Sequence, residues 1–178
     1  LIAIDLLAQA EHDPNAAAAL ITTSEDLAKE VDNELERQVE LLKRSQTIRE
    51  ALIKNGAILI AETIEEAIDF VNEYAPEHIE IMVSKPETFI NKIKNVGSIF
   101  VGEFAPVVIG DYASGANHVL PTSGFAKAYS GLSVYDFIKR PTVQILNKTG
   151  LNKLKKYVVK LAEIEGLKAH AESIKKRQ

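Results

Sequence analysis

Short apolar runs that alternate with amphipathic segments constrain the fold of this chain more than any other feature. Each run is long enough for a buried strand, and the segments between the runs place charged residues at helical spacing. Strands are expected at Ala16–Thr22, Ala57–Ala61, Ile79–Val83 and Gly97–Val101, although the alanines of the first run leave a helix open. Because helices separate the strands, the pattern predicts an α/β fold with a parallel, incomplete Rossmann-like sheet flanked by helices.

Capping and stop signals set the limits of the expected helices. Ser24 is a suitable N-cap, Thr63 opens a capping box, and Asn55-Gly56 and Ala75-Pro76 are stop signals. Helices are therefore expected at about 2–11, 24–45, 47–55, 64–74 and 84–94. A segment at 130–139 is also compatible with a helix.

Two regions of different character divide the chain. Residues 1–140 are expected to form the α/β domain, and residues 141–178 a strand near Thr142–Leu146 followed by two helices that part near Gly166. The first tail helix has apolar residues at helical spacing, but the second has too few for a core of its own. We therefore expect the helical tail to dock on a partner subunit.

Composition excludes several functional classes. The formal charge of −4 over 178 residues, with dispersed basic residues, argues against nucleic-acid binding. The absence of cysteine excludes disulfides and thiolate zinc sites. No apolar run has the length of a membrane span, so the expectation is a cytoplasmic protein without membrane contact. Because the chain begins at Leu1 and its one methionine is Met82, it is expected to be processed or part of something longer.

The longest stretch that reads as neither helix nor strand is Gly110–Gly124, which follows the expected strand Gly97–Val101. It carries Asp111, Asn117 and His118 between glycines, and long ordered loops of this kind often carry function. The alternative is a surface connection in which Asp and Asn only form turns.

The four histidines all lie near a carboxylate or amide. Gln9-x-x-His12 can place an amide oxygen and an imidazole on one helical face, a spacing suited to one cation. The other three pairs are Glu77-His78, Asp111 with His118, and Glu165 with His170. Each pair taken singly is more typical of an ordinary polar surface. The chain contains no P-loop, HExxH or GxSxG motif.

Taken together, seven stretches resemble the histidinol dehydrogenase family in order and in spacing. They are QAEH at 9–12, YAPEHIE at 74–80, GSIF at 97–100, GDYASG at 110–115, NHVLPT at 117–122, SGLSV at 130–134 and EGLKAH at 165–170. The resemblance covers essentially the whole chain and corresponds to the C-terminal portion of that family.

The resemblance implies a zinc- and NAD-dependent enzyme that oxidises L-histidinol to L-histidine through an aldehyde, in an intertwined homodimer. It implies a zinc site made of Gln9, His12 and Asp111, with His170 arriving from the other subunit. The residues implied to contact histidinol are Gln9, His12, His78, Asp111, His118, Glu165 and His170.

The catalytic pair implied by the resemblance is Glu77 and His78, with His78 accepting protons from the substrate and Glu77 activating the water that hydrates the aldehyde. The family's N-terminal region, which supplies most NAD contacts and a substrate serine, has no counterpart here, and no NAD-binding residue is assigned.

Two alternatives belong to other functional classes. One is a noncatalytic α/β module that binds zinc or histidinol without turnover. The other is a zinc hydrolase with Glu77 as base, which the missing HExxH and nucleophile-elbow motifs disfavour.

Overall fold

A computed structural model describes residues 1–177 and divides the chain into two compact units, Leu1–Asp136 and Phe137–Gln178. The fold class is α/β, as the sequence predicts, with short parallel strand pairs flanked by helices. No helix among residues 1–177 has the length and apolar character needed to cross a membrane.

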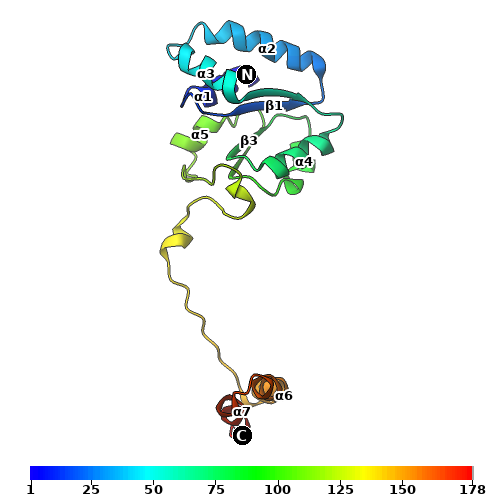
Figure 1. Ribbon diagram of the computed structural model, residues 1–178, viewed down its shortest axis with the longest axis vertical. Coiled ribbons are helices and arrows are strands. Elements are labelled where there is room, and N and C mark those ends of the chain that lie inside the picture. The colour runs from blue at the N-terminus through cyan, green and yellow to red at the C-terminus, as the bar shows by residue number, and fades with distance from the viewer. Residues whose placement is uncertain (178) are drawn as a thin grey trace. The chain divides into compact units, whose positions relative to one another are not determined.

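The first half of the larger unit is built from three helices on one strand pair. Its elements are α1 (Ile2–Ala10), β1 (Ala18–Thr22), α2 (Glu25–Val39), α3 (Ser45–Asn55) and β2 (Gly56–Ile60). The two strands run parallel, and all three helices lie on the same side of them (Figure 1). Leu7 of α1 and Ile48 of α3 are fully buried together with Val39 at the end of α2. Their contact fixes α1, which carries Gln9, against the rest of the unit.

The second half repeats the parallel pairing. Its elements are α4 (Ile64–Tyr74), β3 (His78–Ile81), β4 (Ser98–Val101) and α5 (Val107–Tyr112). Strand β3 pairs with β4, with Glu80 opposite Phe100. Parallel pairing is thus confirmed, but the four described strands form two separate two-stranded pairs instead of one sheet.

Local side-chain bonds explain where the helices begin. Ser24 Oγ accepts a hydrogen bond from Leu27 N, and Thr63 Oγ1 accepts one from Glu66 N. Glu66 also accepts a hydrogen bond from Glu62 N. This reciprocal bond resembles that of a capping box, but its donor is the residue before the N-cap Thr63. The predicted bounds of α4 are confirmed to the residue.

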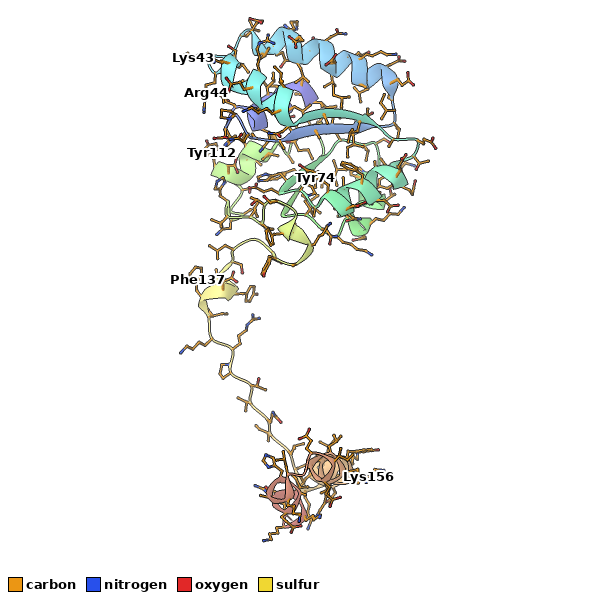
Figure 2. The ribbon with its side chains drawn as sticks, in the orientation of Figure 1. Lys43, Arg44, Tyr74, Tyr112, Phe137 and Lys156 are labelled. Carbon is orange, nitrogen blue, oxygen red and sulfur yellow. The ribbon has the colours of Figure 1, made fainter. Side chains whose placement is uncertain are left out.

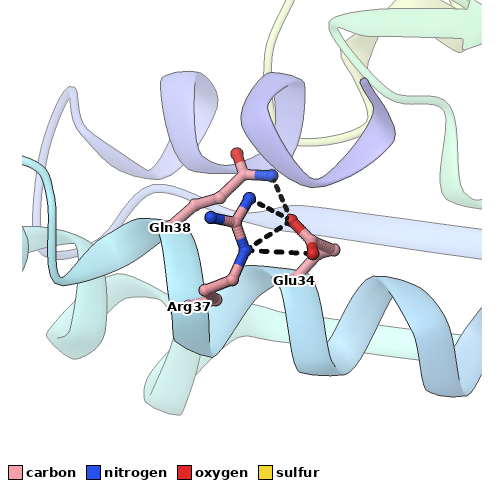
Figure 3. A network of polar contacts seen from close by, with 3 residues as sticks. All are labelled: Glu34, Arg37 and Gln38. Atoms are coloured by element: carbon pink, nitrogen blue, oxygen red, sulfur yellow. Dashed lines mark hydrogen bonds and ion pairs between the residues drawn. The ribbon is translucent and has the colours of Figure 1, made fainter.

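A polar network on α2 stabilises that helix. Glu34 accepts hydrogen bonds from Arg37 and Gln38, one turn further along the same face (Figure 3). These bonds lower the pKa of the exposed Glu34 carboxyl to about 2. Helix α2 ends at Val39, six residues before the predicted limit, because the buried Val39 is followed by a turn in which Leu42 N bonds to Val39 O.

The prediction of a helix at 84–94 is wrong. Two 3-10 turns, Pro86–Thr88 and Ile90–Lys92, stand there instead. The Asn72 side chain of α4 donates to Lys92 O and accepts from Lys94 N and Asn95 N. These bonds from a distant helix satisfy backbone groups that a continuous α-helix would pair within itself.

The predictions of a strand near Thr142–Leu146 and of a helix at 130–139 are also wrong. The described residues 142–146 are exposed and in no strand, since no neighbouring strand pairs with them. At 130–139 only a 3-10 turn, Val134–Phe137, forms, and its residues are exposed.

The smaller unit is a helical hairpin. Helices α6 (Lys148–Ile164) and α7 (Lys168–Lys175) meet at Gly166, whose φ of 75° lies in the left-handed region. Leu167 N closes the end of α6 by bonding to Ala162 O. The two predicted tail helices and their break are confirmed.

Candidate functional site

One face of the β3–β4 pair holds the first part of the site. His78 and Glu80 are two residues apart on β3 and therefore point to the same face of the pair. Phe100 of β4 lies opposite Glu80, and its ring centroid is 5.9 Å from that of His78. Phe100 is buried, so one side of the His78 ring packs against an apolar surface.

Helix α5 covers this face and presents Asp111. Gly110 is buried directly against Phe100, because a Cβ at position 110 would lie 2.6 Å from the ring atom Cζ. Val107 N at the start of α5 donates to Glu80 Oε1 over 2.7 Å. The stretch Gly110–Gly124 was predicted to be neither helix nor strand, and its first three residues are instead the end of this helix. Tyr112, at the end of α5, projects into solvent (Figure 2).

The Gln9-x-x-His12 motif of α1 meets Asp111 of α5 at one small cavity. The cavity has a volume of about 20 Å³. Its lining residues are Asp5, Ala8, Gln9, His12, Glu80, Val107, Val108 and Asp111. A cavity of this size holds about one water molecule. Three of the four predicted zinc ligands therefore lie around a space that suits a single ion.

Asp111 and His118 are joined directly. His118 Nδ1 lies 2.9 Å from Asp111 Oδ1, a hydrogen bond when that nitrogen carries the proton. The Asp111 side chain is only 11% exposed, whereas that of His118 is 65% exposed. A carboxylate can accept about four such bonds, so the contact leaves Asp111 with capacity for a cation.

His78 lies in an environment that favours its neutral form. Partial burial lowers the pKa of His78 below its ordinary value, and the carboxylates of Glu77 and Asp111 act in the opposite direction. His12 and His118 also lie within electrostatic reach and lower the pKa further. A neutral imidazole near neutral pH is the form that accepts a proton from a substrate hydroxyl.

This environment predicts a pH dependence of stability. Since the folded state disfavours the charged imidazole, the stabilising contribution of neutral His78 is present above about pH 6.5, the pKa in the unfolded chain. It is lost as the pH falls through the lower pKa of the folded state. An NMR titration of the metal-free chain should give His78 a pKa below about 6.5. A titration midpoint at or above that value would contradict the assigned burial.

Glu77 is held next to His78 by backbone pairing with the segment before β4. Gly97 N donates to Pro76 O, and Ser98 N donates to Glu77 O over 2.9 Å. Position 97 accepts only glycine at this spacing, since a Cβ there would lie 2.5 Å from Glu77 O. The close approach fixes the backbone of the predicted catalytic pair.

Glu165 and His170 lie in the smaller unit and are exposed at the junction and start of its two helices. Among residues 1–177, no three His, Cys, Asp or Glu side chains are grouped as a metal site would require. The predicted ligand set contains only two such side chains from one copy, His12 and Asp111. Its other two ligands are the Gln9 amide and His170 of another copy of the chain.

Replacing Gly110 with Ala is expected to lower the free energy of unfolding by about 1–3 kcal/mol, because the new Cβ overlaps the edge of the Phe100 ring. Denaturant unfolding measures the change. The double variant Gly110→Ala/Phe100→Leu should recover part of the loss. Gly150→Ala in α6 is the control, because its Cβ would meet only side-chain atoms at 3.3 Å or more. Equal stability of Gly110→Ala and wild type would contradict the packing.

Sequence reasoning missed three residues that shape the site: Asp5, Glu80 and Phe100. The signals were present, since Asp5 is one helical turn before Gln9 and Glu80 is on the same strand face as His78. Glu80 and Phe100 contact α5, a helix that was not expected.

An imidazole, an amide and carboxylates thus line one small cavity on a parallel α/β scaffold, and this cavity is the candidate site of the chain. The family model for histidinol dehydrogenase matches residues 1–178, and the chain belongs to the histidinol dehydrogenase family.

Individual relatives support the assignment. The chain is 54% identical over 177 residues to histidinol dehydrogenase of Methanosarcina mazei, covering 99% of this chain and 41% of that protein. It is also 54% identical over 176 residues to the Methanothermobacter thermautotrophicus protein of the same name, with the same coverage. The crystal structure of histidinol dehydrogenase from Elizabethkingia anophelis superposes with a TM-score of 0.92 at 39% identity, over 98% of this chain and 40% of that one. The chain thus spans about two fifths of the length of these relatives.

Proposed function

We propose that the protein containing this chain oxidises L-histidinol to L-histidine through histidinaldehyde, the last steps of histidine biosynthesis. Family membership supports the substrate and the reaction class. The single observation that carries the proposal is the convergence of Gln9, His12 and Asp111 on one cavity from two segments far apart in the sequence.

The donor set around that cavity fits zinc. Zinc in proteins accepts imidazole nitrogen and carboxylate oxygen, and an amide oxygen completes the set of hard and borderline ligands. Gln9, His12 and Asp111 would hold the ion, with His170 of a second copy as fourth ligand. When bound, zinc would orient and polarise the histidinol amine and imidazole.

His78 is proposed as the general base. Its burial against Phe100 keeps the imidazole neutral, so it takes the hydroxyl proton of histidinol when the first electron pair leaves the carbinol carbon. NAD would accept the two electron pairs in turn. Glu77, held beside His78, removes a proton from the water that adds to the aldehyde carbon, while His78 returns its proton to the aldehyde oxygen. His78, neutral again, then takes a hydroxyl proton of the resulting diol as the second electron pair leaves the carbon. The net change consumes one water and two NAD⁺ per histidinol.

His118 and Glu165 are proposed as substrate contacts. His118 is exposed beside Asp111 and so can reach a ligand at the cavity mouth while still bonded to the carboxylate. Glu165, with His170, would reach the site from the partner subunit.

A homodimer with exchanged tails is proposed for the smaller unit. Apolar side chains of α6 remain exposed at helical spacing: Leu154, Tyr157, Val158, Leu161 and Ile164. An apolar stripe of this kind favours docking on another protein surface. A cytoplasmic location is part of the same proposal.

Turnover by the longer protein tests the proposed function. Histidinol should yield two NADH for each histidine formed, and chelation of the metal should stop the reaction until zinc is restored. Formation of one NADH with accumulation of aldehyde, or no turnover with zinc bound, would contradict it.

For the chain alone, binding without turnover is the second candidate, because it spans 41% of the Methanosarcina mazei relative. Calorimetry should then detect histidinol binding to the zinc-loaded chain while no NADH appears. NADH formation by the chain itself would reject this candidate.

A further inference from the structure

Two of the seven stretches that resemble the family, GSIF at 97–100 and SGLSV at 130–134, contribute no side chain to the proposed chemistry. A third stretch, NHVLPT at 117–122, contributes only His118. These three stretches meet at one side chain, that of Leu120. Their meeting point lies between the proposed substrate contact and the proposed catalytic pair.

Leu120 is the apolar anchor of an otherwise exposed segment. Residues 112–119 are all exposed, and Leu120 is the first partly buried residue after them. Val119, directly before it, is 59% exposed. Leu120 is therefore the point at which this part of the loop packs against the rest of the larger unit.

Two glycines make room for the Leu120 side chain. A Cβ at position 131 would lie 2.6 Å from Leu120 Cδ2, and a Cβ at position 97 would lie 3.3 Å from Leu120 Cβ. Leu120 thus packs directly on the backbone of Gly97 and Gly131. The Cβ at position 97 would also lie 2.5 Å from Glu77 O, so Gly97 is a shared contact of Leu120 and the backbone of the catalytic pair.

Hydrogen bonds hold the residue between Leu120 and His118. Val119 O accepts from Leu132 N over 2.9 Å. Val119 N donates to Asn117 Oδ1 over 2.7 Å, which closes an Asx turn around His118. The place of His118 therefore depends on how the segment after it is packed.

We propose that Leu120 is a positioning residue, which anchors the loop on two glycine backbones and thereby fixes His118 relative to the catalytic pair. The inference rests on the proposed substrate contact of His118. It assigns Leu120 no contact with metal or substrate.

Variants that shorten or displace Leu120 test this role. Leu120→Ala removes the packing on both glycines. Gly131→Ala forces Leu120 Cδ2 to move, and the fold should survive because that atom is the end of a flexible side chain. In Gly131→Ala/Leu120→Val the overlap is gone, because the new Cβ would lie 3.9 Å from Cγ, where the shorter side chain ends. Val119→Ala, at the exposed neighbouring position, is the matched control.

The first readout is the tautomer of the His118 imidazole in the metal-free chain, measured by NMR of its ring nitrogens. An ionised carboxylate only accepts, so the bond to Asp111 requires the proton on Nδ1 of His118. Wild type, Val119→Ala and the double variant should show this Nδ1–H form. Leu120→Ala and Gly131→Ala should lose it in favour of the Nε2–H form.

The second readout is histidinol oxidation by the longer protein. In Leu120→Ala and Gly131→Ala, kcat/KM should fall by about 10- to 100-fold. Most of the change should appear in KM, because a misplaced His118 weakens a substrate contact while the catalytic pair keeps its own backbone bonds. The double variant should return KM toward that of wild type, and Val119→Ala should match wild type.

An unchanged tautomer and KM in Leu120→Ala would overturn the inference, as would a double variant as impaired as Gly131→Ala. A changed tautomer with wild-type KM would also overturn it, because Leu120 would then only stabilise the loop. Should Gly131→Ala fail to fold, Leu120→Ala still decides the result. If the longer wild-type protein does not oxidise histidinol, the proposed function fails, and the tautomer comparison alone decides whether Leu120 positions His118.

Discussion

Replacing His78 with Ala should reduce histidinol oxidation by the longer protein by about 10²- to 10⁴-fold, the usual contribution of a positioned general base. The loss should appear in kcat, because the imidazole acts on the proton that leaves the substrate. Zinc content should be unchanged, since His78 does not line the cavity of Gln9, His12 and Asp111. Steady-state kinetics with metal analysis of the same preparation measures both.

His78→Asn is the companion variant, because it keeps a polar group beside Phe100 without a base of useful pKa. It should be as inactive as His78→Ala and fold as wild type does. Wild-type rates in either variant would remove His78 from the catalytic pair.

Replacing Asp111 with Ala should abolish zinc retention. The side chain is 11% exposed and is the carboxylate of the proposed ligand set, so its removal leaves two ligands from the larger unit. Loss of one ligand is expected to weaken zinc affinity by at least about 100-fold, more than the loss of an outer-shell partner. Metal content after dialysis checks the expectation.

Asp69→Ala is the control, because Asp69 is an exposed carboxylate of α4 outside the cavity. Asp111→Ala also frees His118 from its hydrogen bond, so the His118→Ala variant should be tested in parallel. If His118→Ala keeps its zinc and Asp111→Ala does not, the carboxylate is the ligand. Unchanged zinc in Asp111→Ala would contradict the ligand assignment.

Local signals account for what the sequence predicts correctly. Ser24 and Thr63 mark helix starts because they bond to amides three residues away. The short apolar runs mark strands, although most of their side chains are only partly buried. All four strands in the larger unit and the parallel pairing follow from such nearby patterns.

The errors share a different cause, because long-range bonds decided the structure there. Asn72 caps backbone groups at 92–95 and replaces the expected helix with turns, and Glu80 caps Val107 at the start of α5, which extends into an expected loop. Neither partner can be inferred from adjacent sequence. The expected strand Thr142–Leu146 was wrong because β-branched residues form strands only where a neighbour is available to pair.

The site residues also divide into those that local spacing predicts and those that depend on long-range packing. The motif Gln9-x-x-His12 and the Glu77-His78 pair were visible as local spacings, whereas the cavity that joins the first motif to Asp111 depends on the packing of α1 and α5. That packing depends in turn on Gly110, whose missing side chain admits the Phe100 ring. A glycine in the sequence does not indicate which group approaches it.

The most direct test of the central claim is zinc-edge anomalous diffraction from crystals of the zinc-loaded protein that contains this chain. The account predicts one strong anomalous peak for each copy of the chain, within bonding distance of Gln9, His12 and Asp111, with His170 of another copy completing the ligands. A peak on other residues, or zinc-loaded crystals with no peak at the cavity between α1 and α5, would contradict it.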